Sequence, residues 1–465
     1  MSLLLKKIGG TLVLMAVTAL FTSCTTAQPA AATLPVEPAV NTPAAANTPW
    51  PTATATAMPL EGILAVDAAV SRGEVNPYVY GTNVGPWQDL SKSKIERISD
   101  AGFTFLRFPG GNWGDENYIS EAAIDEFIRI CREVNAEPMI NMPLVNFSAE
   151  KAAAMVEYVN ITQGYGVKYW GIGNEPDLYL GKRGISGYDT IRFNEDWRAY
   201  AAAMEAVDAS ILLVGPELSQ WTGVTANDPK DMHYKDWMTE FLTVNGDMVD
   251  VVAFHRYPFG NFDPFENELL KSSAEWDEII PALRELIHRT TGRDLPIAVT
   301  EVNSNWSNRK GGETTPDSLV NAVWWADALG RMIEQDVDIV AQFAVAGDGG
   351  WSLLKSADPR PAYQVHLLYN QFGTDLVQST SGIEGVSIFA ALNHEGALTL
   401  IIVNTTGEAV QAPIEIANFN PAASGALTLL DINHAADATV PITTSNYFAL
   451  DLPAKSVTLL VIPAL

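Results

Sequence analysis

Two glutamates stand out in this chain because each one closely follows a short apolar run. Glu175 comes after residues 167–173 with only Asn174 between, and Glu301 comes directly after residues 295–300. Two carboxyl groups held side by side can share a displacement at a sugar carbon, one donating a proton to the leaving oxygen while the other attacks. The pair therefore predicts glycosidic chemistry, provided that the fold brings the two strand ends together.

Eight strand-like apolar runs alternate with amphipathic segments of helix length through the middle of the 465-residue chain. The runs cover residues 79–84, 103–108, 137–142, 167–173, 211–215, 250–254, 295–300 and 339–344. Such alternation predicts a parallel sheet covered by helices. Eight repeats over about 300 residues favour a closed (β/α)8 barrel, in which the loops after the strands converge on one opening.

The pattern changes after residues 360–372, which we predict to be the last barrel helix. Shorter alternating strands follow, at residues 386–391, 397–403, 412–416, 426–430, 448–452 and 456–462, as is typical of a β-sandwich. The predicted fold class is α/β: a (β/α)8 TIM barrel over residues 61–372 with an accessory C-terminal antiparallel β-sandwich over residues 373–465. Residues 61–72 either begin the barrel or add a strand to the sandwich.

Polar and aromatic side chains follow most of the predicted barrel strands. In chain order they are Asn83, Trp87, Arg107, Asn112, Trp113, Asn174, Glu175, His255, Tyr257, Glu301, Trp306 and Trp351. Taken singly, each has an ordinary explanation: Asn-Glu-Pro is a common helix start, and most tryptophans belong to a core. Their conjunction at the strand ends favours a carbohydrate site, in which the tryptophans offer flat apolar faces to sugar C–H groups.

At these motifs the chain resembles the retaining glycoside hydrolases of clan A, which are built on (β/α)8 barrels. In that clan the acid/base glutamate follows an asparagine after strand four and the nucleophile ends strand seven, which matches Asn174-Glu175-Pro176 and Thr300-Glu301. Residues 106–112 look like the family 51 α-L-arabinofuranosidases. Residues 173–178 are similar to families 39 and 79, and residues 300–304 are nearer family 39. The chain departs from each of these families at one motif or more, so the resemblance does not identify the substrate.

The resemblance implies separate roles for the two glutamates. Glu301 would attack the anomeric carbon and form a glycosyl-enzyme, while Glu175 would protonate the leaving oxygen and then deprotonate the incoming water. We expect the pKa of Glu175 to be raised, because burial and the charge of Glu301 both disfavour its ionised form. We also expect the two carboxyl groups to lie about 5 Å apart.

The same resemblance implies supporting roles for four neighbours. Asn174 would hydrogen-bond the sugar 2-hydroxyl. Tyr257 or His255 would hydrogen-bond and orient the glutamates. Arg107 would lie beneath Glu301 and keep it ionised.

The N-terminus has the pattern of a secretory signal over residues 1–23, with Lys6 and Lys7 before an apolar stretch. Its ending resembles a bacterial lipoprotein site with Cys24 as the lipid acceptor; an ordinary cleaved signal is the alternative. Residues 24–60 are rich in Ala, Thr and Pro, which predicts a disordered linker. We therefore expect an enzyme tethered through a lipid to the membrane, at the extracellular face of the cell envelope.

Charge and missing motifs narrow the function further. A net charge of -27 repels nucleic acid and anionic polymers, so the expected partner is a neutral carbohydrate of arabinofuranoside, xyloside or β-glucan type, ahead of uronates. The chain has no Gly-x-Ser-x-Gly, His-Glu-x-x-His or Cys-x-x-Cys motif, and we predict no cofactor and no metal. The rival hypothesis is a catalytically silent carbohydrate-binding surface lipoprotein.

Overall fold

The computed structural model describes residues 59–465. Within that range the chain forms a closed eight-stranded barrel and a separate nine-stranded sheet. The predicted signal, Cys24 and nearly all of the predicted linker lie outside the described residues. Among residues 59–465, no helix is both long enough and apolar enough to cross a membrane.

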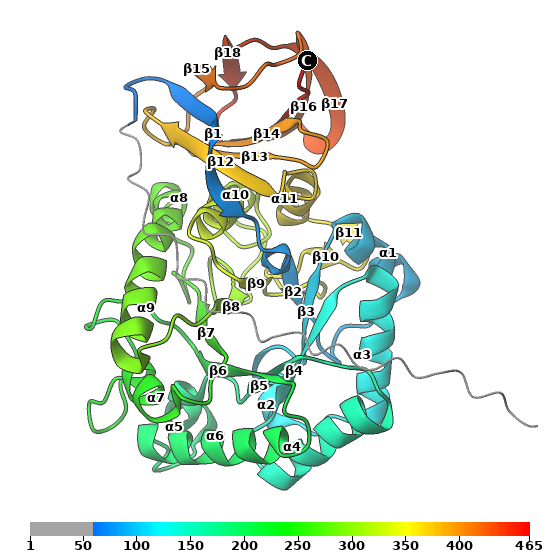
Figure 1. Cartoon of the computed structure of the whole chain (residues 1–465), viewed down its shortest axis with the longest axis vertical. Helices are drawn as coiled ribbons and strands as arrows, with labels where there is room; N and C mark the ends of the chain where they lie inside the picture. The colour runs from blue at the N-terminus through cyan, green and yellow to red at the C-terminus, as the bar shows by residue number, and fades with distance from the viewer. Residues whose placement is uncertain (1–58) are drawn as a thin grey trace, which may run out of the picture. The chain divides into compact units, whose positions relative to one another are not determined.

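The barrel strands run parallel and pair in chain order, and the last pairs with the first to close the ring (Figure 1). They are β2 (Gly81–Asn83), β3 (Phe105–Phe108), β4 (Glu137–Met142), β5 (Tyr169–Ile172), β6 (Leu212–Leu218), β7 (Val251–Arg256), β8 (Ile297–Val302) and β9 (Ile339–Gln342). Each overlaps one of the eight predicted runs. The predicted fold class is confirmed.

Helices connect the barrel strands, and most of them surround the barrel on its outside (Figure 1). They are α1 (Lys92–Asp100), α2 (Gly111–Glu116), α3 (Glu121–Val134), α4 (Ala149–Val156), α5 (Tyr179–Arg183), α6 (Thr190–Glu205), α7 (Trp237–Asn245), α8 (Glu266–Ser272), α9 (Trp276–Thr291), α10 (Leu319–Glu334) and α11 (Pro361–Tyr369). Helix α3 illustrates the local rules: Ser120 accepts a bond from the backbone N–H of Ala123, and Asn135 ends the helix in the left-handed conformation. Phe127 and Cys131, four residues apart, are buried on one face.

The barrel interior changes from apolar to polar along the strands. Phe105, Met139 and Ile339 belong to an apolar cluster inside the barrel. Because side chains alternate along a strand, Arg107 faces the same interior two residues further along β3 than Phe105. The apolar cluster therefore forms the floor on which the polar residues at the carboxyl ends rest.

The second sheet orders its strands as β17-β16-β19-β14-β13-β12-β1-β15-β18. Their bounds are β1 (Leu64–Glu74), β12 (Asp375–Ser381), β13 (Val386–Leu392), β14 (Leu398–Asn404), β15 (Val410–Ala417), β16 (Ser424–Leu430), β17 (Ala435–Thr443), β18 (Tyr447–Leu452) and β19 (Ser456–Ile462). A short hairpin, β10 (Leu354–Lys355) with β11 (Asp358–Pro359), lies apart from it. Strand β1 pairs antiparallel with β12 and parallel with β15, so a segment from before the barrel sits inside this sheet.

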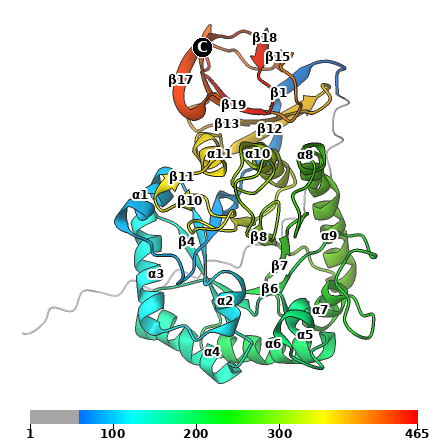
Figure 2. The ribbon, with the colours of Figure 1, turned by 180° about the vertical axis from the view of Figure 1, so that it is seen from behind.

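The sheet folds over on itself into a sandwich. Ile388 of β13 and Leu400 of β14 share one apolar cluster with Ile414 of β15 and Leu450 of β18. The opposite face of β13 and β14 lies against α10 (Figures 1 and 2), and Phe389 belongs to the same core cluster as the helices of the barrel. The sandwich therefore braces the side of the barrel that carries α10 and α11.

We expect the contact between α10 and the sandwich to tolerate no added atoms. A Cβ at Gly330 would lie 2.2 Å from the ring of Phe389, which is only 2% exposed. Gly330→Ala should therefore lower the free energy of unfolding by about 1–3 kcal/mol in guanidinium chloride, despite alanine's higher helix propensity. The matched control is Gly407→Ala, where nothing lies within 4 Å of the added Cβ; equal loss in both variants would contradict the packing argument.

Candidate active site

The carboxyl ends of the barrel strands bring together the polar side chains that the sequence singles out. Arg107 lies on β3, His255 on β7 and Glu301 on β8, and Glu175 follows shortly after β5. These segments are far apart in the chain, but they belong to one closed barrel, in which β7 and β8 are neighbours and a single strand separates β3 from β5 and β5 from β7. The prediction that the two glutamates follow different strands of one barrel is therefore met by the topology.

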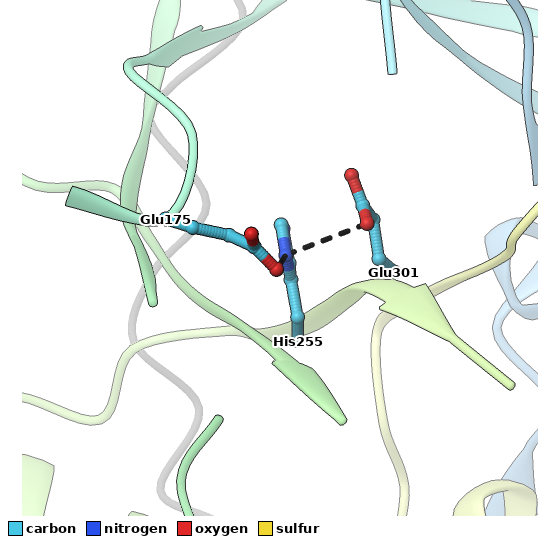
Figure 3. Close-up of side chains that lie close together, drawn as sticks. All are labelled: Glu175, His255 and Glu301. Carbon is cyan, nitrogen blue, oxygen red and sulfur yellow. Dashed lines mark hydrogen bonds and ion pairs between the residues drawn. The ribbon is translucent and has the colours of Figure 1, made fainter. Parts of the chain in front are cut away.

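Glu175 and Glu301 face each other with His255 between them (Figure 3). One ligand atom from each of the three residues lies within 4.8 Å of the other two. The nearest carboxyl oxygens of Glu175 and Glu301 therefore lie no more than 4.8 Å apart.

Glu301 is held by three donors and is only 3% exposed. Its Oε1 accepts from Nη1 of Arg107 at 2.8 Å and from the backbone N–H of Gly111 at 2.8 Å. Its Oε2 accepts from the hydroxyl of Tyr257 at 2.9 Å. A cation and two neutral donors converge on this group, so its surroundings stabilise a negative charge.

Glu175 is also buried, but it faces a titratable partner. Its Oε1 lies 3.4 Å from Nδ1 of His255. Burial favours the neutral carboxyl, but His255, with Lys182 and Arg183, outweighs burial and holds the pKa of Glu175 below its ordinary value. The expectation of a raised pKa is therefore wrong, because the sequence did not show the cationic ring that stabilises the carboxylate.

His255 carries the proton that was expected on Glu175. Burial alone would lower its pKa, but Glu301, Glu175 and Glu217 surround the ring and raise the pKa of His255 to about 10. Its Nδ1 faces Glu175 at 3.4 Å and Glu301 at 3.6 Å, and its Nε2 faces Glu217 at 3.0 Å. Glu175 and His255 thus face each other as a carboxylate and a protonated ring.

Glu217, at the end of β6, is a third buried carboxylate, and our sequence analysis missed it. Its Oε2 accepts from Nη2 of Arg107 at 2.6 Å and from the hydroxyl of Thr300 at 3.1 Å. The pairing of β6 with β7 shifts register next to it, between Pro216 and Leu218, and such a bulge re-aims a side chain. The signal was present, since Glu217 ends an apolar run as Glu301 does, but the predicted run stopped at residue 215.

Arg107 joins the two sides of the site from below. Its Nη1 donates to Glu301 and to Oδ1 of Asn83 at 2.9 Å, and its Nη2 donates to Glu217 and to Oδ1 of Asn174 at 2.9 Å. Asn83 is buried and donates to two backbone carbonyls. Expected as a substrate ligand, Asn83 instead supports Arg107, because both hydrogens of its amide are used inside the barrel.

Asn174 and Asn112 lie together beside Glu175. Nδ2 of Asn174 donates to Oδ1 of Asn112 at 3.3 Å, and Nη2 of Arg183 donates to the same oxygen at 2.8 Å. Arg183 also pairs with the buried carboxylate of Asp115. This network fixes the rim of the site next to Glu175 through two residues that the sequence did not indicate, Arg183 and Asp115.

Aromatic rings line the side of the site near Glu301. Trp87 lies 6.2 Å from Trp113 and 6.5 Å from Phe343, which lies 5.6 Å from Trp351, all between ring centroids. Trp87 is 42% exposed. Together these four rings form one wall. The sequence did not indicate that Phe343 belongs to it. Such faces pack well against sugar C–H groups.

Trp306 stands apart from that wall. It is 45% exposed, and the ammonium of Lys182 lies 5.2 Å from its ring centroid. Lys182 is also one of the cations that lower the pKa of Glu175. Trp306 therefore lies beside α5, which carries Lys182, rather than in the four-ring wall.

Glu175, His255 and Glu301 are also residue types that bind metals. The electrostatics here oppose a cation, because Glu301 is already paired with Arg107 and His255 holds its proton with a pKa of about 10. A histidine binds a metal through a deprotonated nitrogen. The cluster is thus better suited to proton transfer than to metal binding.

No family model matches the chain. Among curated proteins it is similar to the intracellular exo-α-(1→5)-L-arabinofuranosidase of Acetivibrio thermocellus, with 24% identity over 245 residues, which are 44% of this chain and 46% of that protein. It is also similar to the exo-α-(1→6)-L-arabinofuranosidase of Bifidobacterium longum, with 25% identity over 331 residues, 60% of this chain and 59% of that protein. The chain spans about half the length of these curated relatives.

Solved structures match the fold over most of the chain. The bifunctional glucanase-xylanase CelM2 from a metagenome library superposes with a TM-score of 0.69 at 21% identity, covering 87% of this chain and 99% of that one. The α-L-arabinofuranosidase of Thermotoga maritima, in complex with arabinose, gives a TM-score of 0.69 at 19% identity, covering 86% and 99%. The chain therefore has the barrel-and-sandwich fold of clan A glycoside hydrolases, as the resemblance of its motifs implied.

We expect Arg107 to be the main electrostatic support of the site. Arg107→Met removes the guanidinium that pairs with both Glu217 and Glu301, so the free energy of unfolding should fall by about 3–5 kcal/mol. The double variant Arg107→Met/Glu217→Gln also lacks the charge of Glu217, so it should recover part of the lost free energy of unfolding. Denaturant unfolding of the two variants measures both effects.

The control for this experiment is Arg129→Met. Arg129 bonds Glu126 and Glu133 on the exposed face of α3, where water screens the charges. Arg129→Met should therefore leave the free energy of unfolding nearly unchanged. A small effect of Arg107→Met, similar to that of the control, would show that the buried ion pairs do not stabilise the site.

Proposed function

We propose that this protein is a retaining glycoside hydrolase that works by double displacement. The observation that carries the proposal is the pair Glu175 and Glu301, placed at the ends of different strands with their ligand atoms within 4.8 Å. Retaining enzymes hold their two carboxyl groups about 5–5.5 Å apart, so that the second can attack the sugar directly. The curated relatives named as arabinofuranosidases and the shared fold support the same class.

In the first step Glu301 attacks the anomeric carbon. Its Oε1 is held by Arg107 and Gly111, which leaves Oε2, bonded by Tyr257, as the attacking oxygen. The bond to the leaving oxygen breaks as Glu175 donates a proton to it. The products are a glycosyl ester at Glu301 and a free alcohol.

In the second step a water replaces the departed alcohol. Glu175, now ionised, removes a proton from the water as its oxygen attacks the anomeric carbon from the other side. The ester bond breaks and Glu301 leaves as a carboxylate, stabilised again by its three donors. Two inversions at one carbon give net retention of configuration.

The proposed substrates are neutral glycans of arabinofuranoside, xyloside or β-glucan type. Two features support neutral sugars: the chain carries a net charge of -27, and the wall near Glu301 is made of apolar rings rather than cations. The relatives named above act on arabinofuranosides by their names, and the glucanase-xylanase shares the fold. These observations favour pentose glycosides and β-glucans alike as substrates.

A panel of aryl glycosides tests the class of reaction. The panel holds α-L-arabinofuranoside, β-xyloside, β-glucoside and β-glucuronide, and hydrolysis of at least one neutral member is expected. Proton NMR of the first-formed sugar should show the anomeric configuration of the substrate. Product of inverted configuration would overturn the retaining mechanism, and oligosaccharide binding without any hydrolysis would make the protein a sugar-binding protein.

Substitutions of the two glutamates should impair hydrolysis in different ways. Glu301→Gln should abolish turnover, because an amide cannot form the ester. Glu175→Ala should slow substrates with poor leaving groups by about 10²–10⁴-fold, but aryl glycosides with good leaving groups should react when azide is added and give a glycosyl azide of retained configuration.

Glu285→Gln is the matched control for these two variants. Glu285 lies exposed on α9 and pairs with Arg289, so its substitution should leave kcat and KM unchanged. If azide instead rescued Glu301→Gln and gave a glycosyl azide of retained configuration, the proposed roles would be exchanged.

A further inference from the structure

Glu217 bonds the backbone of Glu175 directly and reaches Glu301 through Arg107. It is fully buried. Its backbone carbonyl accepts from the N–H of Glu175 at 2.8 Å, and its Oε2 receives Arg107 and Nε2 of His255. One residue therefore fixes the backbone at Glu175, the cation beneath Glu301 and the ring between the two glutamates.

The neighbours of Glu217 stabilise its ionised form. Burial favours the neutral carboxyl, but the Arg107 guanidinium and the His255 ring outweigh burial and lower the pKa of Glu217. An ionised carboxylate only accepts hydrogen bonds. The nitrogen that faces it, Nε2 of His255 at 3.0 Å, must therefore be the donor.

This contact leaves a single position on the ring at which a proton can exchange. With Nε2–H bonded to Glu217, only Nδ1 can release or gain a proton, and Nδ1 faces Glu175 at 3.4 Å. In a histidine, the bond made by one ring nitrogen decides the protonation of the other. Without the charge of Glu217, either nitrogen of a neutral ring could hold the proton.

We propose that Glu217 is a positioning residue that keeps a proton on Nε2 of His255, so that Nδ1 passes one proton to Glu175 before the acid step. The inference rests on the proposed hydrolysis, since it explains how Glu175 becomes an acid. It is distinct from the roles of Glu175 and Glu301, because Glu217 acts through His255 and makes no contact with the sugar.

The proton count is the same before and after this transfer. Before it, His255 is cationic and Glu175 is a carboxylate; after it, His255 is neutral with its proton on Nε2, and Glu175 is a carboxylic acid. The N–H bond at Nδ1 breaks and an O–H bond forms on Oε1 of Glu175, with no other group changing charge. Glu175 then gives this proton to the leaving oxygen.

The pH dependence follows from the groups that face His255. These are Glu175 after β5, Glu217 on β6 and Glu301 on β8. Tyr257 after β7 bonds Glu301, and Arg107 of β3 reaches Glu217 and Glu301 from below. The three carboxylates hold the proton on the ring, so loss of one of them releases it at lower pH. The alkaline limb of the kcat profile should report this release.

The test is Glu217→Gln, which keeps the shape of the side chain and removes its charge. We expect kcat to fall about 10- to 100-fold with KM within about threefold, the size of a lost charged hydrogen bond. The alkaline limb should move about one to two units toward lower pH. Wild-type kcat with an unmoved alkaline limb would overturn the inference.

Glu334→Gln is the matched control. Glu334 is a carboxylate on α10, where it accepts a bond from Ser379 of the sandwich, and burial raises its pKa to about 7. Its substitution removes a carboxyl group of the barrel at another place and should leave the pH profile unmoved. A similar shift in both variants would show that the effect does not depend on the contact with His255.

A measurement on the unaltered protein keeps the inference falsifiable if Glu217→Gln does not fold. The chain has six histidines, so ¹⁵N-histidine NMR, with His255 assigned through His255→Gln, can follow both ring nitrogens. We expect Nε2 to stay protonated at every pH and Nδ1 to lose its proton in alkali; a neutral ring protonated at Nδ1 would overturn the proposal. If the protein hydrolyses no glycoside, the proposed function fails, and the tautomer still decides whether Glu217 positions the proton.

Discussion

The buried guanidinium of Arg107 is the interaction on which the rest of the site depends. A charge inside a barrel is costly unless it is paired and hydrogen-bonded. Arg107 meets this condition with Glu217 on one side and Glu301 on the other, and with Asn83 and Asn174 as neutral acceptors. The planar fork of arginine suits this task, because it directs several donors into fixed directions. Its position beneath the strand ends sets where each acidic side chain can lie.

The close approach of the glutamates follows from the charges that surround them. Glu175, Glu217 and Glu301 would repel one another if nothing lay between them, but Arg107 and protonated His255 alternate with them. Each carboxylate therefore touches a cation rather than another carboxylate. This alternation allows ligand atoms of Glu175 and Glu301 to lie within 4.8 Å while one proton stays available for exchange.

The sequence alone predicted the eight barrel strands because their apolar runs recur at regular spacing, and it placed both glutamates by the strands that they follow. It missed β12 and β17, since β17 is an edge strand with mostly exposed residues and shows no apolar alternation. It missed Glu217 because the predicted run stopped at residue 215, just before the register shift between Pro216 and Leu218 at the end of β6. The state of Glu175 was mispredicted because it depends on contacts with His255 that only the folded chain makes.

The hydrogen bonds of the two glutamates support their proposed roles independently of any motif. Glu301 receives a guanidinium, a backbone N–H and a phenol, so every contact favours a lasting negative charge, as a nucleophile and leaving carboxylate needs. Glu175 receives one side-chain hydrogen bond, from a ring that can itself carry the proton. An acid/base group must change its charge twice in each turnover, and a partner that exchanges protons allows this where a fixed cation would oppose it. The asymmetry of the donors, rather than the distance between the carboxyl groups, therefore distinguishes the proposed acid from the proposed nucleophile.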